Sequence, residues 1–123
     1  MKSSFYLVPV LVIFSLIGSA QAEPRIPDLI LGGEWSSSCV SKDAVKRTAC
    51  TQYVLGMRAV FTLWQLAEGG SPIVCINLDA TTGQLIDVGR NFVRDNPRYR
   101  DIPVARVLFD AFHQAWPCER RGP

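Results

Sequence analysis

The chain of 123 residues has little of what most enzymes need: it contains one histidine, no Cys-x-x-Cys pair and no Gly-x-Ser-x-Gly turn. A single histidine cannot build a multi-histidine metal site, and the spacing of the four cysteines fits no zinc pattern. The missing serine turn removes the usual sign of an α/β-hydrolase. His113 stands among apolar residues of a predicted helix, and we interpret it as a helix surface residue. We therefore expect no catalytic residue, no metal and no cofactor, and predict that the protein is not an enzyme.

The net charge of the chain is also close to zero. The formal charge is +2, and without Lys2 the chain has 12 basic side chains against 11 acidic ones. This balance does not suggest a nucleic acid or an anionic membrane surface as partner. The carboxylates of Asp79, Asp87 and Asp95 recur every eight residues, which matches no calcium loop.

Long apolar stretches are few, and the clearest, Phe5–Ile17, follows Lys2 and precedes the small-residue site Ala20-Gln21-Ala22. This is the pattern of a secretory signal peptide, and the stretch is too short to span a bilayer comfortably. We predict an exported protein with no membrane anchor after cleavage. The expected organisation is a signal peptide at 1–22, an extended leader at 23–32, a helical domain at 33–118 and a tail at 119–123.

The strongest predicted helix runs from Asp43 to Glu68, where there is no proline and apolar residues recur at helical spacing. Ser41 or Asp43 is expected to cap its start. The residues expected to face the core are Cys50, Tyr53, Val54, Met57, Val60, Phe61 and Trp64. Those expected to face solvent are Arg47, Thr51, Arg58, Thr62 and Gln65.

Three further helices are predicted. A short one covers Glu34 to about Val40, and another opens at Thr81, with Gln84 completing a capping box, and stops at Asn96-Pro97. The last follows Pro103 and ends at Pro117. Its expected inner stripe is Val104, Val107, Leu108, Ala111, Phe112, Ala115 and Trp116. The fold class is thus all-α, a small bundle of three main helices plus a short N-terminal helix, crosslinked by two disulfides.

The four cysteines of an exported chain this small indicate two disulfides. Three pairings are possible. If successive helices are antiparallel, the last helix ends near the loop that follows the long helix. Chain direction therefore favours Cys39 with Cys50 and Cys75 with Cys118, although the spacing alone leaves the other two pairings open.

Arginine and tyrosine are enriched at protein interfaces, and Arg94, Arg98, Tyr99 and Arg100 gather around one predicted turn. We interpret these four as a candidate partner-binding surface, against the alternative of an ordinary solvated turn. The loop at 69–77 is a second candidate, because exposed loops carry function more often than framework helices do.

A series of short motifs resembles the Rap/Tai family of immunity proteins, which protect bacteria against type VI secretion toxins. The motifs are Gly33-Glu34-Trp35 before Cys39, then Cys50 with Tyr53 and Gly56, Cys75 with Thr82, Gln84 and Leu85, Pro97, and Phe112 to Cys118. The resemblance covers about residues 32–118. It implies an all-helical periplasmic protein that binds a cell-wall-cleaving amidase, blocks its active site and forms a homodimer.

Two other functions remain open from the residues alone. One is a periplasmic acid-stress chaperone that exposes apolar faces at low pH, although two disulfides resist such loosening and one histidine offers little titration near neutrality. The other is a secreted helical domain with no toxin partner. Dye binding to apolar surface at low pH would favour the chaperone, and an effector gene next door would favour the immunity protein.

Overall fold

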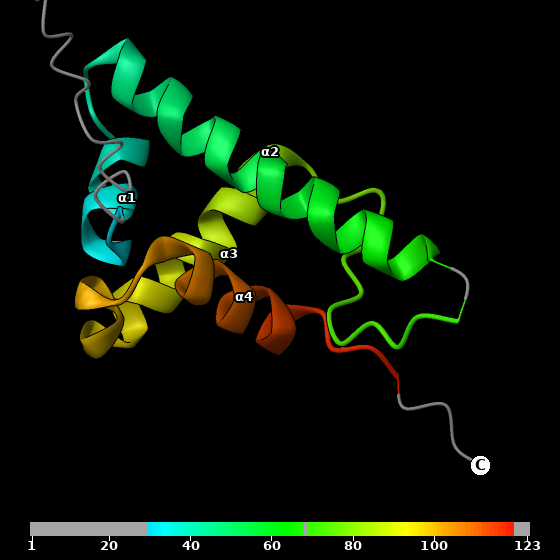
Figure 1. The fold of residues 1–123 in the computed structure, drawn as a ribbon. Coiled ribbons are helices and arrows are strands. Elements are labelled where there is room, and N and C mark those ends of the chain that lie inside the picture. The colour runs from blue at the N-terminus through cyan, green and yellow to red at the C-terminus, as the bar shows by residue number, and fades with distance from the viewer. Residues whose placement is uncertain (1–29, 68, 120–123) are drawn as a thin grey trace, which may run out of the picture.

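The computed structural model describes residues 30–67 and 69–119. The predicted signal peptide, residues 23–29 of the leader and residues 120–123 of the tail lie outside the described residues. The described elements, in chain order, are α1 (Gly32–Cys39), α2 (Ala44–Leu66), α3 (Thr82–Asp95), a 3₁₀ helix η1 (Pro97–Asp101) and α4 (Val104–Ala115) (Figure 1). Within this part of the chain the structure confirms the all-α class.

The helix boundaries follow local chemistry. The Asp43 carboxylate accepts a hydrogen bond from the Val45 amide at 2.8 Å and caps α2. At the start of α3 the Thr81 hydroxyl accepts from the Gln84 amide, and the Gln84 side chain accepts from the Thr81 amide, at 3.2 and 2.8 Å. The predicted caps of both helices are thus confirmed. The basic turn expected after Pro97 is the short helix η1.

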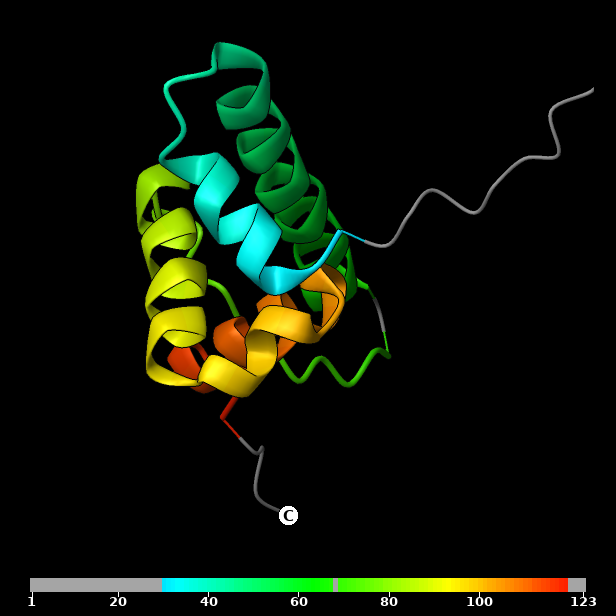
Figure 2. The same ribbon diagram turned by 90° about the vertical axis from the view of Figure 1, so that its left-hand side faces the viewer.

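The long helix α2 lies along one side of the molecule, and α1, α3 and α4 lie on the other (Figure 1). Viewed after a quarter turn, α1 crosses between α2 and α3 (Figure 2). The centre is filled by large apolar side chains from all four α-helices. The largest of these that are fully buried are Trp35, Phe112, Leu85, Leu108 and Val54.

The exposed and buried sides of α2 differ in part from the predicted pattern. Val60 was expected in the core but is 58% exposed. Arg58 and Gln65 were expected to face solvent, yet both are partly buried. The reason is that Arg58 follows buried Val54 by four residues, and Gln65 follows buried Phe61 by four, so both lie on the core side of the helix.

These two polar side chains fasten the loop between α2 and α3. Both terminal nitrogens of Arg58 donate at 2.7 Å, Nη1 to the carbonyl of Ala80 and Nη2 to that of Leu78. The Gln65 amide donates to the Ile76 carbonyl at 3.3 Å. Hydrogen bonds from a charged donor are stronger than neutral ones, so Arg58 fixes the segment that leads into α3.

The segment 74–76 belongs to the core, although it forms no helix. Val74 and Ile76 are buried, and Val74 forms an isolated antiparallel bridge with Pro117. Cys75 is joined to Cys118 at this place, and Cys39 to Cys50 near the start of α2. The favoured pairing is therefore confirmed. Ala115 was expected to face inward but is exposed, because α4 ends there and the chain turns away to meet Val74.

Gly89 is required by the contact of α3 with its neighbours. A Cβ atom at this position would lie 2.6 Å from Cη2 of Trp35 and 2.7 Å from Cδ2 of Leu108. Because both neighbours are fully buried, neither can move aside freely. We expect Gly89→Ala to lower the free energy of unfolding by about 2 kcal/mol, measured by urea denaturation followed by circular dichroism.

Gly56→Ala is the matched control, since Gly56 also lies inside a helix but a Cβ there meets nothing within 4 Å. This change should raise stability by up to about 1 kcal/mol, because alanine favours the helix more than glycine does. Effects of the same sign and size for the two variants would show that Gly89 has no packing role.

Candidate functional site

One end of the molecule brings α1, α3 and η1 together. The Gly32 amide donates to the Ile102 carbonyl at 2.8 Å, which ties the start of α1 to the end of η1. A Cβ on Gly33 would lie 3.2 Å from Cβ of Arg100. The two consecutive glycines thus allow η1 to approach α1 closely, and this approach sets the position of Arg100.

The four residues predicted to bind a partner lie at this end, but they divide between two hollows. Arg94 and Arg100 line one, and Arg98 and Tyr99 line the other. The residues are therefore close in the chain but face two different surfaces, and their role in binding remains a prediction.

Tyr99 has a structural contact with each of two helices. Its ring packs edge-on against Phe92, with ring centroids 4.7 Å apart, and its hydroxyl donates to the Asp110 carboxylate at 3.0 Å. The Arg98 guanidinium lies 5.3 Å from the centre of the same ring. Tyr99 therefore joins η1 to α3 and α4, and its replacement would disturb the fold as well as the surface.

The hollow beside Tyr99 has a volume of about 310 Å³ and is lined by Arg98, Tyr99, Ile102, Arg106 and Asp110. Nε of Arg106 donates to the Asp110 carboxylate at 2.8 Å, and this hydrogen bond raises the pKa of Arg106. Asp110 is the one carboxylate in this lining and offsets part of the positive charge of its two arginines.

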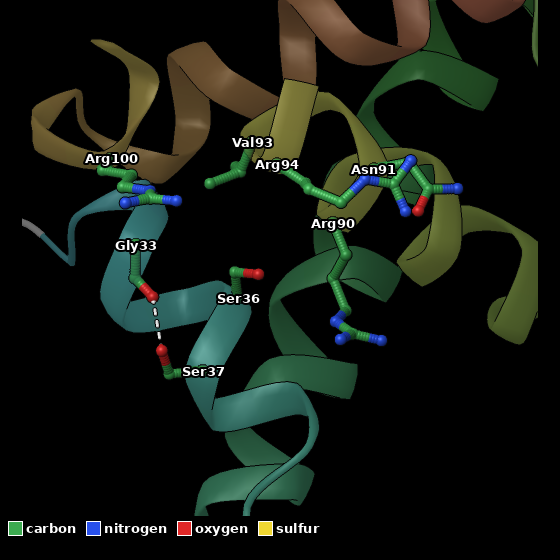
Figure 3. Close-up of a pocket in the computed structure, with 8 residues that line it drawn as sticks. All are labelled: Gly33, Ser36, Ser37, Arg90, Asn91, Val93, Arg94 and Arg100. Carbon is green, nitrogen blue, oxygen red and sulfur yellow. Dashed lines mark hydrogen bonds between the residues drawn. The ribbon is translucent and has the colours of Figure 1, made fainter. Parts of the chain in front are cut away.

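The second hollow is larger and more basic. It has a volume of about 520 Å³ and lies between α1, α3 and η1. In Figure 3 the side chains of Arg90 and Arg100 reach it from opposite sides of Ser36, which projects from α1. The full lining is Gly33, Ser36, Ser37, Arg90, Asn91, Val93, Arg94 and Arg100, and we call it the arginine hollow.

The lining of the arginine hollow contains three arginines and no acidic residue. Arg94 has a carboxylate partner outside the lining, Asp95, at 2.9 Å. Its hydrogen bond holds the pKa of the Asp95 carboxyl below the ordinary value, so this exposed pair weakens as the pH falls through the lowered pKa. Nε of Arg90 is buried and, within the described residues, has no hydrogen-bond partner.

Sequence reasoning did not identify Arg90 or Ser36 as parts of this site. Arg90 precedes Arg94 by four residues on α3, and that spacing was a usable signal that both share one face. The contribution of Ser36 had no signal in the sequence, because it depends on how α1 crosses α3.

A different surface follows the outward side of α2. Val45, Val60, Leu63 and Leu66 are exposed by 58–76%, and the exposed helix positions between them include Ala49, Gln52, Gly56 and Ala59. This side carries no charged residue, and we call it the neutral face of α2. Apolar faces of this extent on soluble proteins often mark an interaction site.

The loop that formed the second predicted surface is only partly available. Val74 and Ile76 are buried, while Ile73 and Leu78 are 41% and 63% exposed. In the described part of the chain, no group of three His, Cys, Asp or Glu side chains is placed to hold a metal ion. Among the helices at 30–67 and 69–119, none has the length and apolar character needed to cross a membrane.

Comparison with known proteins supports the family resemblance. The model of the Rap1a immunity proteins matches residues 31–118, which includes every described helix and all four cysteines. No curated protein and no solved structure gives a significant match. The matched region covers more than half of the chain, and the chain belongs to the family of Rap1a immunity proteins.

Proposed function

We propose that this protein is a periplasmic immunity protein that binds a peptidoglycan amidase delivered by type VI secretion and occludes its active site. The observation that carries the proposal is the family match over residues 31–118. Membership in the family indicates a role in immunity to a toxin, and hence a protein partner. Proteins of this kind are generally not enzymes and act by binding.

The crosslinked scaffold supports a binding role. The Cys39–Cys50 disulfide joins α1 to α2 at one end, and Cys75–Cys118 joins the α2–α3 loop to the end of α4. A scaffold held in this way loses little conformational entropy on docking, which favours tight association. Disulfides form in oxidising compartments such as the periplasm. They therefore support the location that the N-terminal sequence predicts.

The structure gives less support to an acid-stress chaperone. Among residues 30–67 and 69–119, no polar or charged side chain is fully buried. Acid opening is driven by carboxylates that are paired or buried in the native state, and the paired aspartates here, Asp95 and Asp110, lie at the surface or partly exposed. The described part of the chain thus shows no carboxylate whose protonation would strongly favour unfolding at low pH.

The neutral face of α2 is the surface we assign to the expected homodimer. A two-fold axis places the same face of each copy against the other, so any charged residue near the axis would lie close to its own copy and be repelled. The neutral face of α2 carries no charged residue, so this repulsion does not arise. Since α2 is about 35 Å long at 1.5 Å per residue, the contact between the two copies would be extended. A dimer formed in this way uses α2 and leaves the arginine hollow, whose lining comes from α1, α3 and η1, open to another partner.

The test uses the purified product of the neighbouring gene and its cleavage of isolated peptidoglycan. We expect the oxidised protein to abolish cleavage at stoichiometric amounts, and light scattering to show a complex whose mass contains two copies of this chain. Protein that has been reduced and alkylated is the control and should not inhibit. Unchanged cleavage of peptidoglycan in the presence of excess oxidised protein would contradict the proposed function.

A further inference from the structure

The arginine hollow contains more hydrogen-bond donors than acceptors to satisfy them. Of its three arginines only Arg94 forms an ion pair within the described residues, and that partner, Asp95, is not in the lining. Arg90 and Arg100 have no ion-pair partner among the residues at 30–67 and 69–119. The hollow therefore carries an uncompensated positive charge.

Arg90 shows where a ligand would make the most difference. Its Nε is buried from solvent and unpartnered in the described chain, and an unpaired buried donor is destabilising, more so when it is charged. An atom buried from solvent cannot itself be reached from the hollow. The terminal nitrogens of the same guanidinium are not among the buried unpartnered atoms and make no hydrogen bond within the described residues, so an acceptor entering the hollow would meet these. The planar guanidinium presents paired N–H groups, which match the two oxygens of a carboxylate.

The neutral side chains of the lining complete the donor set. The Ser37 hydroxyl already donates to the Gly33 carbonyl at 2.9 Å. The Ser36 hydroxyl and the side-chain amide of Asn91 make no hydrogen bond within the described residues. A volume of about 520 Å³ also lies in the range of pockets that enclose small ligands, so an acidic side chain fits with room to spare.

We propose that the arginine hollow binds an acidic side chain, Asp or Glu, that a protein partner presents on a protruding loop, with Arg90 and Arg100 contacting the carboxylate and Ser36 adding a hydrogen bond. This inference rests on the proposed function, because the partner is taken to be the toxin. The hollow is formed before binding: buried Trp35 and the Cys39–Cys50 disulfide hold α1, and the Gly33 contact holds Arg100 beside it.

The experiment is an NMR titration of the oxidised protein that follows the Arg Nε–Hε signals. The probe is a blocked di-glutamate peptide, with the blocked di-glutamine peptide as neutral control. We expect saturable shifts of Arg90 and Arg100 with the acidic peptide alone. Arg90→Gln and Arg100→Gln should each weaken the apparent affinity by about 10-fold, which corresponds to about 1.4 kcal/mol.

Lys46→Gln is the matched variant, because it removes one exposed positive charge that lies on α2 and is not part of the lining of the hollow. It should leave the titration unchanged. Shifts that do not saturate, or an equal loss in Lys46→Gln, would reduce the effect to general charge attraction and overturn the inference. Tighter binding of inorganic phosphate than of the acidic peptide would overturn it as well, by indicating a general oxyanion site.

The same variants separate this inference from the proposed function. If the wild-type protein fails to inhibit the neighbouring effector while the arginine signals still respond to the acidic peptide, only the proposed function fails. If inhibition is intact in both Arg90→Gln and Arg100→Gln, the toxin does not use the hollow and the inference fails alone.

Discussion

Removal of the Cys75–Cys118 disulfide is expected to lower the free energy of unfolding by about 4 kcal/mol. The bridge spans 43 residues and includes the whole of α3, η1 and α4. Without it the unfolded chain gains the conformational freedom of that large loop, and stability falls accordingly. The change to make is Cys75→Ala with Cys118→Ala, and the measurement is a guanidinium denaturation curve under oxidising conditions.

The other disulfide provides the comparison. Cys39–Cys50 spans only 11 residues, so its loop-closure contribution is about 3 kcal/mol. Cys50 is also buried, and its replacement by alanine adds a small packing loss. Each double variant should therefore be compared with the wild type both with and without reductant, because the reduced wild type lacks the disulfides but keeps the cysteine side chains. A Cys75/Cys118 double variant whose denaturation midpoint equals that of the oxidised wild type would contradict the expectation.

Trp35→Ala is the second change with a large expected effect, a loss of about 4 kcal/mol. Trp35 is 1% exposed and belongs to α1, which packs against both α2 and α3. Its indole Nε1 donates to the Cys50 carbonyl at 3.4 Å, and its ring is the surface against which Gly89 packs. Truncation leaves a cavity that the crosslinked α1 cannot close by moving inward. Urea denaturation monitored by circular dichroism measures the loss.

Trp35→Phe separates packing from hydrogen bonding. Phenylalanine fills much of the same space but cannot donate to the Cys50 carbonyl. We expect Trp35→Phe to lower the free energy of unfolding by less than half as much as Trp35→Ala does. A Phe variant as unstable as the Ala variant would indicate that the indole N–H, a long hydrogen bond here, matters more than the buried ring.

Trp35 and the Cys39–Cys50 disulfide also bear on the proposed binding site. Trp35 and the Cys39–Cys50 bridge hold α1, and α1 supplies Ser36 to the arginine hollow. A loosened α1 would let the hollow widen, so Trp35→Ala should also weaken the acidic-peptide titration. The fold and the candidate site are thus connected through one short helix.

The predicted helices agree with the structure because their ends are set by nearby residues. Asp43 caps α2 through an amide two residues away, and Thr81 and Gln84 form their capping box within three residues. The buried stripe of α4, from Val104 to Phe112, repeats at helical spacing. Such features depend on short-range geometry, and a sequence displays them directly.

The errors concern residues whose surroundings come from distant segments. Arg58 was expected in solvent but donates to carbonyls 20 and 22 residues away, and no local pattern indicates that contact. Val60 was expected in the core, but α1, α3 and α4 all pack on the other side of α2. The segment 74–76 is buried through its pairing with the end of α4, which lies more than 40 residues later.

By itself, the amino-acid sequence determined the helical class, the helix caps, the presence of two disulfides and the basic turn that carries Arg98 and Arg100. Only the tertiary structure decided that Arg90, Arg100 and Ser36 line one hollow while Tyr99 joins η1 to α3 and α4. The physical reason is that helix formation and capping depend on groups a few residues apart. The hollow instead depends on how closely α1 approaches η1 and α3, and the packing of Gly33 and Trp35 sets that distance.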